Sequence, residues 1–129
     1  MSAVPSLVPD WSASAENSLA TKQYYGLEYS AADQVDVCDG ATDQVIGVLQ
    51  NDPAAGEEAT VRSFGITKVV SDGNAAAIVV GDLLGTNATG KAVKKTTDTD
   101  KLCGLALDAS TADGTVIRML LTIGAQLAG

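Results

Sequence analysis

The sequence contains no histidine among its 129 residues. This absence excludes Ser-His-Asp and Cys-His nucleophilic centres, together with every metal site built on imidazole. The enzymatic alternative that remains is a small hydrolase with paired carboxylates, for which Asp39 and Asp43 are candidates. The segment that carries them has the composition of a turn and no aromatic platform for a sugar. The sequence therefore predicts a protein that is not an enzyme and that has no cofactor.

Basic residues are scarce as well, since 8 Lys and Arg face 16 Asp and Glu and the net charge is −8. A nucleic-acid backbone would be repelled by this charge, so we expect no DNA or RNA partner. The charge is uneven: residues 1–58 carry ten acids and only Lys22, whereas residues 59–129 carry six acids and seven bases. No apolar run reaches the ~18 residues of a membrane span, and the N-terminus does not read as a signal peptide. We expect a protein made in a cytoplasm, with no membrane partner.

Cysteine is limited to Cys38 and Cys103, which lie 65 residues apart. Neither has a second cysteine nearby, so a metal knuckle and a thioredoxin-like pair are both excluded. We expect buried, reduced thiols that act as small apolar side chains. A disulfide between the two is the alternative.

Aromatic residues number only five, while Gly (13), Val (13) and Thr (12) are abundant. This composition favours short β-strands and tight turns over a helical bundle. Alternating or apolar runs between turn signals predict an all-β fold, a small β-barrel or β-sandwich of about eight short strands in one domain over 21–129. The expected strands cover 34–38, 45–49, 59–64, 66–70, 75–80, 91–95, 102–107 and 115–123.

The last expected strand is apolar on one face and half apolar on the other. Its second face carries Val116, Arg118, Leu120 and Thr122. Such a pattern is typical of a strand that is covered on both sides. We therefore expect Arg118 and Leu120 to lie near a contact between copies of the chain.

A short internal repeat links two parts of the sequence. Residues 46–49, a turn with Gly56 and residues 60–62 recur as 103–106, a turn with Gly114 and residues 116–118. The spacing is 57 residues at the first Gly and 56 at the Arg. Two copies are too few for a solenoid, so we expect two similar hairpins that close one small barrel or sandwich.

Residues 1–20 read as an extended N-terminal arm, because Pro5 and Pro9 interrupt a set of apolar residues without a period. A disordered tail is the alternative. Trp11 favours an arm that docks on a surface, since a tail that only aids solubility has little use for it. We expect the arm to make its contacts through Val4, Pro5, Leu7, Val8 and Trp11.

The segment 85–92 reads GTNATGKA and is close to a phosphate-binding loop. Ala92 lacks the hydroxyl that such a loop uses to hold Mg²⁺, and the residues that follow favour a strand where a helix is required. We expect a hairpin loop here.

Residues 39–49 (DGATDQVIGVL) are followed by a polar turn and by residues 59–65. In this order they resemble the head decoration proteins of tailed bacteriophages, also called capsid cement or stabilising proteins. Three later segments, 81–84 (GDLL), 90–93 (GKAV) and 104–107 (GLAL), continue the similarity, with Ala109 and Gly114 behind them. The resemblance covers about 34–123.

The resemblance implies a small β-barrel without catalytic residues that sits as a homotrimer on the outside of a mature phage head. The partner would be the major capsid (coat) protein, with the N-terminal arm reaching onto the shell. The leading hypothesis is a structural virion protein, made in the host cytoplasm, that binds across coat subunits and stabilises the capsid. The alternative is a head-fibre or virion surface module that presents its outer face to a host or to glycans.

Overall fold

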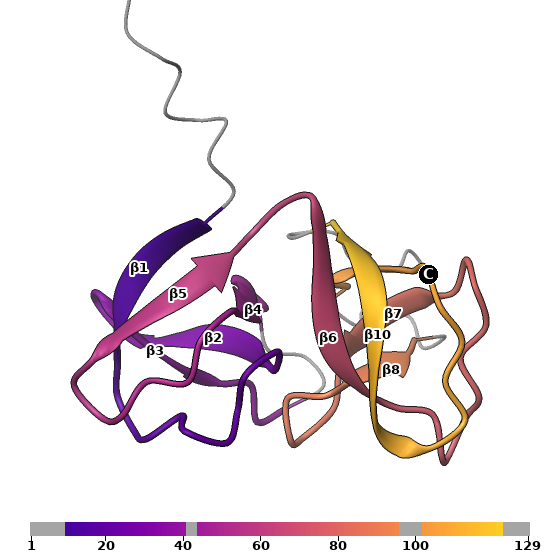
Figure 1. The fold of residues 1–129 in the computed structure, drawn as a ribbon, viewed down its shortest axis with the longest axis horizontal. Helices are drawn as coiled ribbons and strands as arrows, with labels where there is room; N and C mark the ends of the chain where they lie inside the picture. Colours follow the sequence, from indigo (N-terminus) through magenta and orange to yellow (C-terminus); the bar gives the residue numbers. More distant parts are fainter. Residues whose placement is uncertain (1–9, 41–43, 96–101, 123–129) are drawn as a thin grey trace, which may run out of the picture.

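The computed structural model describes residues 10–40, 44–95 and 102–122, and every regular element in these ranges is a β-strand (Figure 1). This confirms the all-β fold. There are ten strands: β1 (Asp10–Ala15), β2 (Gly26–Ala31), β3 (Gln34–Val37), β4 (Gly47–Leu49), β5 (Glu58–Arg62), β6 (Ile66–Asp72), β7 (Leu83–Thr86), β8 (Ala92–Lys94), β9 (Gly104–Ala106) and β10 (Asp113–Leu121).

Three of these strands, β1, β2 and β7, were not expected from the sequence. β1 (DWSASA) and β2 (GLEYSA) are rich in small and polar residues, and the four-residue β7 (LLGT) is too short to show a period. Conversely, the apolar run at 75–80 forms no strand. It contributes a single bridge, in which Ile78 pairs with Ser110.

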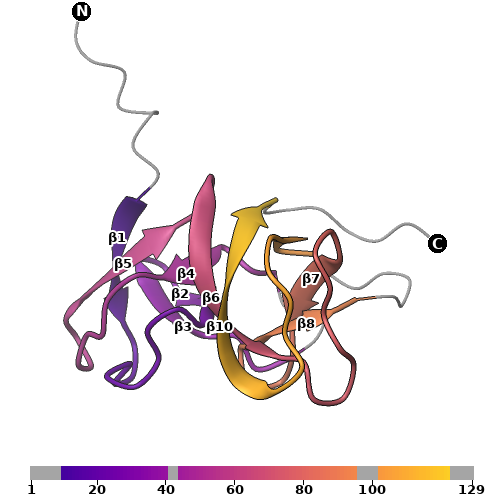
Figure 2. The ribbon, with the colours of Figure 1, turned by 45° about the vertical axis from the view of Figure 1, so that its right-hand side comes forward.

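The strands form two closed barrels that lie side by side (Figures 1 and 2). The first, barrel 1, has the ring order β1-β3-β2-β4-β5, and the second, barrel 2, has the order β10-β6-β8-β7-β9. Read from its first strand, barrel 2 repeats the topology of barrel 1. Each barrel has one parallel pair, β1 with β3 and β6 with β8, and its other pairs are antiparallel.

The repeat seen in the sequence therefore reflects a duplicated barrel. We had expected the two hairpins of the repeat to close a single barrel. Instead, each hairpin closes a barrel of its own. Strand register sets the correspondence: Leu27 pairs with Gly47 in barrel 1 as Leu84 pairs with Gly104 in barrel 2. The Arg match of the repeat does not hold in space. Leu49 pairs with Val61 and Ala106 pairs with Met119, so the position of Arg62 corresponds to Leu120 and not to Arg118.

One glycine in each barrel, Gly47 or Gly104, allows a close approach between paired strands. A Cβ added at Gly47 would lie 2.5 Å from the carbonyl oxygen of Arg62. A Cβ added at Gly104 would lie 2.6 Å from the carbonyl oxygen of Leu120 and would also collide with the side chain of Met119. Both obstructions include backbone atoms, which cannot move aside. The same close approach of two strands thus requires a glycine in each barrel, and the two glycines lie 57 residues apart in the sequence.

The cores are filled by the inward side of each alternating strand. In barrel 1 the buried set is Ala13, Ala15, Leu19, Leu27, Val35, Leu49, Ala59 and Val61. The buried set of barrel 2 includes Val69, Leu84, Ile117 and Met119, and it is joined by Cys38, Val45 and Val48 from the first half of the chain. The two barrels thus pack against one another through apolar side chains, in addition to being joined by a linker.

Tyr24 ties the two barrels together through its backbone. Its N–H donates to the carbonyl of Leu49 (2.7 Å), and its carbonyl accepts from the N–H of Val70 (2.9 Å). Its φ of 71° lies in the left-handed region, which non-glycine residues adopt rarely. A second tie lies next to it, where the N–H of Gly26 donates to the carbonyl of Gly90 (2.8 Å).

The N-terminal segment is integrated further into the fold than the sequence suggested. β1 lies within the range expected for the arm, but it pairs with β5 and β3 and so closes barrel 1. Leu19, 1% exposed, belongs to the core. An arm hypothesis therefore concerns residues 1–9, which lie outside the described residues. A deletion as far as residue 20 would remove a barrel strand.

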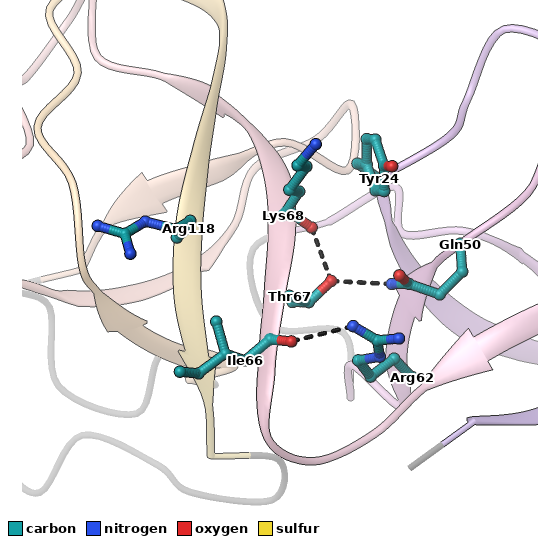
Figure 3. A pocket seen from close by; sticks show the side chains of 7 residues that line it. All are labelled: Tyr24, Gln50, Arg62, Ile66, Thr67, Lys68 and Arg118. Carbon is teal, nitrogen blue, oxygen red and sulfur yellow. Dashed lines mark hydrogen bonds between the residues drawn. The ribbon is translucent and has the colours of Figure 1, made fainter.

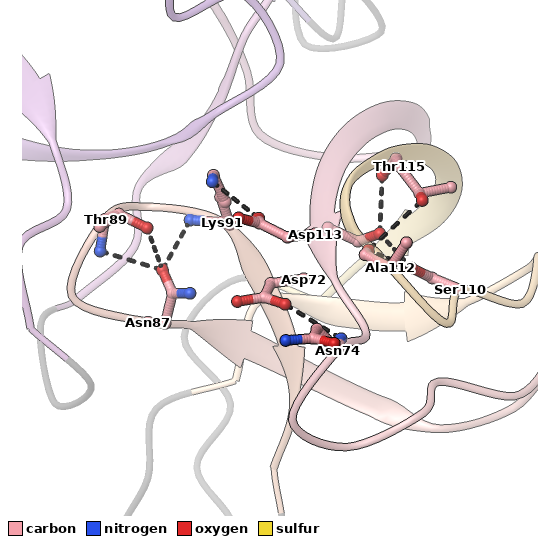
Figure 4. A network of polar contacts seen from close by, with 10 residues as sticks. Asp72, Asn74, Asn87, Thr89, Lys91, Ser110, Ala112, Asp113 and Thr115 are labelled. Carbon is pink, nitrogen blue, oxygen red and sulfur yellow. Dashed lines mark hydrogen bonds and ion pairs between the residues drawn. The ribbon is translucent and has the colours of Figure 1, made fainter.

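The segment that resembles a phosphate-binding loop is a hairpin between β7 and β8, as we expected (Figure 4). The side-chain oxygen of Asn87 accepts hydrogen bonds from the N–H of Thr89 and from the N–H of Lys91, both at 3.0 Å. The amine of Lys91 lies 2.7 Å from a carboxylate oxygen of Asp113. The lysine that would bind phosphate is thus used in an ion pair within the chain.

Both cysteines are buried, and neither forms a disulfide. The Sγ of Cys103 lies 3.7 Å from the Sδ of Met119 inside barrel 2. Burial raises the pKa of the Cys103 thiol to about 12. This thiol is therefore neutral and unreactive in the folded protein at neutral pH.

Replacing Gly47 by alanine should destabilise barrel 1. The new methyl group meets a backbone carbonyl, so strands β4 and β5 must separate, at a cost of about 2–3 kcal/mol in the free energy of unfolding. Urea unfolding followed by circular dichroism measures this, with Ser30→Ala on the exposed part of β2 as the control. Equal stability of the two variants would contradict the close approach.

Melting temperatures with and without reductant should coincide, because the thiols do not form a bridge. A bridge that closed a loop of this length would contribute ~4 kcal/mol, which is easily detected. Alkylation of Cys103 should require unfolding. A large drop in melting temperature on reduction would show that the two cysteines pair.

Candidate functional site

The outer face of β6 and β10 carries three cross-strand pairs that we call the outer ladder. Directly opposite residues are Val70 and Val116, Lys68 and Arg118, and Ile66 and Leu120. The alternating burial of both strands turns these residues outward, while Val69, Ile117 and Met119 face the core. The ladder thus presents a pair of cations between two apolar pairs.

Apolar side chains also continue around barrel 2 from one end of the ladder. Leu120 pairs with Leu105 of β9, which in turn pairs with Leu83 of β7. Ile66 is 55% exposed, and Leu120 and Leu83 are each 39% exposed. We call Ile66, Leu120, Leu105 and Leu83 the apolar row. Exposed apolar residues that are contiguous in this way mark interaction surfaces more often than single exposed residues do.

A pocket of about 390 Å³ lies where the ladder meets barrel 1 (Figure 3). It is lined by Tyr24, Gln50, Arg62, Ile66, Thr67, Lys68 and Arg118. The amide of Gln50 donates to the hydroxyl of Thr67 (2.8 Å), which itself donates to the carbonyl of Lys68. Three of the chain's eight bases line this pocket, although acids outnumber bases two to one in the sequence.

The strand ends nearest the pocket are held by polar contacts, most of them within barrel 1 and one of them from barrel 1 to barrel 2. Arg62, at the end of β5, binds Asp10 at the start of β1 with distances of 2.7 and 3.1 Å, and it donates to the carbonyl of Ile66 (3.0 Å). The indole N–H of Trp11 donates to Ser63 (2.6 Å), whose hydroxyl donates to the carbonyl of Ile46 (2.7 Å). β1 therefore begins, and β10 ends, at the end of the molecule where residues 63–65 join the barrels.

Arg118 forms a two-pronged ion pair with Asp108, at 3.0 Å from Nε and 2.9 Å from Nη2. The backbone N–H of Arg118 donates to the same carboxylate (2.9 Å). These hydrogen bonds, the side-chain ones first, lower the pKa of Asp108 to about 2, and the pair raises the pKa of Arg118. The geometry holds the guanidinium in one position on an exposed surface.

The site residues expected from the sequence fall into three groups. Val4, Pro5, Leu7 and Val8 lie outside the described residues. Trp11 lies in β1, where it packs against the core of barrel 1, and its ring centroid is 5.9 Å from that of Tyr29. Arg118 and Leu120 lie next to one another on the exposed face of β10. Their contact with another copy of the chain stays a prediction.

Four members of the ladder were not recognised as site residues: Ile66, Lys68, Val70 and Val116. The expected strand at 66–70 contained a signal, because one of its faces carries Ile, Lys and Val, and adjacent exposed apolar residues favour an interaction surface. What the sequence did not provide was the register that places Lys68 opposite Arg118. Within the described part of the chain, no three metal-binding side chains gather, and no helix is long and apolar enough to cross a membrane.

Comparison with known proteins gives this architecture a family. Residues 12–121 match the phage cement protein family. The match spans most of the chain, so the protein belongs to this family, and it is a structural component of a phage capsid. A solved structure with the same fold is the N base of head fiber gp8.5 from bacteriophage phi29. It is 20% identical, has a TM-score of 0.63, and the alignment covers 88% of this chain and 92% of that chain. A search of curated proteins gave no match.

The lowered pKa of Asp108 predicts an acid-dependent contribution to stability. The carboxylate form is favoured in the folded protein, so the contribution is present above the usual pKa of 3.8 and is lost as pH falls toward about 2. Arg118→Gln should raise the pKa of Asp108 toward 3.8, as an NMR titration of its carboxyl group would show. Lys91→Gln is the control and should leave this titration unchanged. An unchanged pKa in Arg118→Gln would rule out the guanidinium as the cause.

Proposed function

We propose that this protein decorates the outer surface of the assembled phage head as a homotrimer and stabilises it by binding across neighbouring coat-protein subunits. Family membership supports the location on the capsid. The observation that carries the proposal is the apolar row on a closed barrel of an otherwise acidic chain, in which Ile66, Leu83 and Leu120 are exposed and Leu105 is half-buried. A site formed by several coat subunits exists only after assembly, so binding there favours the assembled head by linkage alone.

Two parts of the chain contact different partners. The apolar row, with Arg118 beside it, contacts another copy of the chain. Residues 1–9 reach onto the coat protein from the start of β1, through Val4, Pro5, Leu7 and Val8. Trp11 acts at the base of this arm, because its indole is bonded to Ser63 and its ring packs on barrel 1. The protein is made in the host cytoplasm and joins the head from outside.

The second candidate is a head-fibre module that presents its outer face to a host or to glycans. Its support is the likeness of fold to the base of a phi29 head fiber. Both candidates require attachment to the head, but only decoration requires that the bound protein makes the head more resistant to thermal disruption. The disruption temperature of heads, measured with and without saturating protein, distinguishes them. Decoration predicts that the protein raises this temperature, and a fibre module predicts that the temperature is unchanged.

Deleting residues 2–9 should weaken binding to emptied, expanded heads at least about tenfold while leaving the fold intact. The fold is preserved because β1 begins at Asp10. Co-sedimentation measures binding, and an unchanged melting temperature serves as the folding control. The full chain should bind expanded heads to saturation and should not bind free coat protein. If the truncated chain binds as tightly as the full chain, the coat contacts lie on the barrels.

Light scattering at micromolar concentration should give three times the 13.0 kDa mass of the chain. Leu120→Asp should reduce this mass, because it places a charge in the apolar row. Thr111→Asp makes the same change in charge at an exposed loop position and should leave the mass unchanged. A wild-type chain that scatters as a monomer would end the proposal of a trimer.

A further inference from the structure

The pocket between the two barrels is lined by cations and by no acid. Three of its seven lining residues are basic, in a chain where acids outnumber bases two to one. Figure 3 shows the guanidinium of Arg118 turned away from Lys68 and Arg62. Arg118 therefore borders the pocket, and the positive charge that faces into it comes from Lys68 and Arg62.

Lys68 brings a positive charge that no acid of the described chain neutralises at close range. Its amine lies 5.9 Å from the centroid of the Tyr24 ring, within the range of a cation–π contact. Among the residues that the structure describes, no carboxylate lies within ion-pair distance of this amine. The side chain is exposed, so a partner from outside can reach it.

Arg62 is held in position and still has donors to offer. Its Nε and Nη2 donate to Asp10, at 2.7 and 3.1 Å, and its Nη1 donates to the carbonyl of Ile66 at 3.0 Å. Three of the five N–H groups of the guanidinium are thus used, which leaves two. A guanidinium that is already fixed loses little freedom when it binds a further acceptor.

The floor of the pocket keeps its own donors for contacts within the chain. The amide of Gln50 donates to the carbonyl of Val48 (3.1 Å) and to the hydroxyl of Thr67 (2.8 Å), and that hydroxyl donates to the carbonyl of Lys68. The donors left for a ligand are therefore cationic, which favours an anion. At the rim, Ile66 is 55% exposed and can pack on methylene groups. An acidic side chain of a protein provides both a carboxylate and methylene groups.

The position of the pocket indicates which protein carries that side chain. Arg62 lines the pocket and also binds Asp10, the residue at which β1 begins. The pocket thus lies beside the base of the segment 1–9, which in the proposed function reaches onto the coat protein. A coat surface that receives this segment is therefore also close to the pocket.

We propose that the pocket binds the carboxylate of an aspartate or glutamate side chain of the coat protein, between the amine of Lys68 and the remaining N–H groups of Arg62. This inference rests on the proposed function and names the chemistry of a second contact beside the arm. Two contacts on one face strengthen each other, because the first to form raises the effective concentration for the second.

Reversing the charge of Lys68 tests the proposal. Lys68→Glu should bind emptied, expanded heads at least about tenfold more weakly than the wild type in co-sedimentation, because a carboxylate then faces a carboxylate. Lys68→Arg keeps the charge and should bind within about threefold of the wild type. Lys22→Glu is the matched control, since Lys22 also lies over a tyrosine ring, that of Tyr25 at 4.8 Å, but does not line the pocket. It should leave binding unchanged.

Two further measurements exclude indirect effects of the substitution. The melting temperature of Lys68→Glu should not fall below that of the wild type, because the residue is exposed. Its mass by light scattering should equal that of the wild type. A reduced mass would place Lys68 at a contact between copies and overturn the proposal, as would equal head binding by Lys68→Glu and Lys22→Glu.

Cross-linking identifies the partner directly. A carbodiimide joins an amine to a carboxylate in contact with it, forming an amide while the reagent takes up the water that is lost. On decorated heads, mass spectrometry after digestion should find Lys68 coupled to an aspartate or glutamate of the coat protein. Coupling to an acid of another copy of this chain, or no coupling on fully decorated heads, would overturn the proposal. Heads that bind no wild-type protein would instead refute the proposed function itself.

Discussion

The tie at Tyr24 fixes how the two barrels are placed, and the surfaces described above depend on that placement. One residue donates to β4 and accepts from β6, so its peptide groups belong to both barrels at once. The left-handed φ of 71° is held there by these two hydrogen bonds and by the shared apolar contact of Val45 and Val48. Without this placement the pocket would not form, because its lining comes from both barrels.

Duplication explains why a short chain holds two complete cores. The inward positions correspond from barrel to barrel, as Leu27 does to Leu84 and Gly47 does to Gly104. The outward positions do not correspond. Barrel 1 exposes acids and little apolar surface, whereas barrel 2 exposes the apolar row and the cations of the ladder. The two barrels thus share one topology for packing, while their outer faces differ in charge and in exposed apolar surface.

The sequence was most informative where strands alternate strongly. β10 was expected with the correct two faces, and Arg118 and Leu120 lie on the outward one. β1 was mistaken for part of an arm because its inward residues, Ala13 and Ala15, are too small to give an apolar signal. The number of barrels could not be read from the repeat, since two hairpins of equal sequence can close one ring or two. The ladder depends on register between strands about fifty residues apart, which no local pattern contains.

Closure of both barrels affects how copies of the chain can associate when the protein is concentrated. Each of the ten strands has a hydrogen-bonded neighbour on both sides, so neither barrel presents an unpaired edge strand to another molecule. Edge-to-edge pairing of strands, a common route from crowded β-proteins to amyloid, is therefore disfavoured in the described part of the chain. Where copies of these barrels crowd together, they meet through side chains, and charge and shape then decide which surfaces bind.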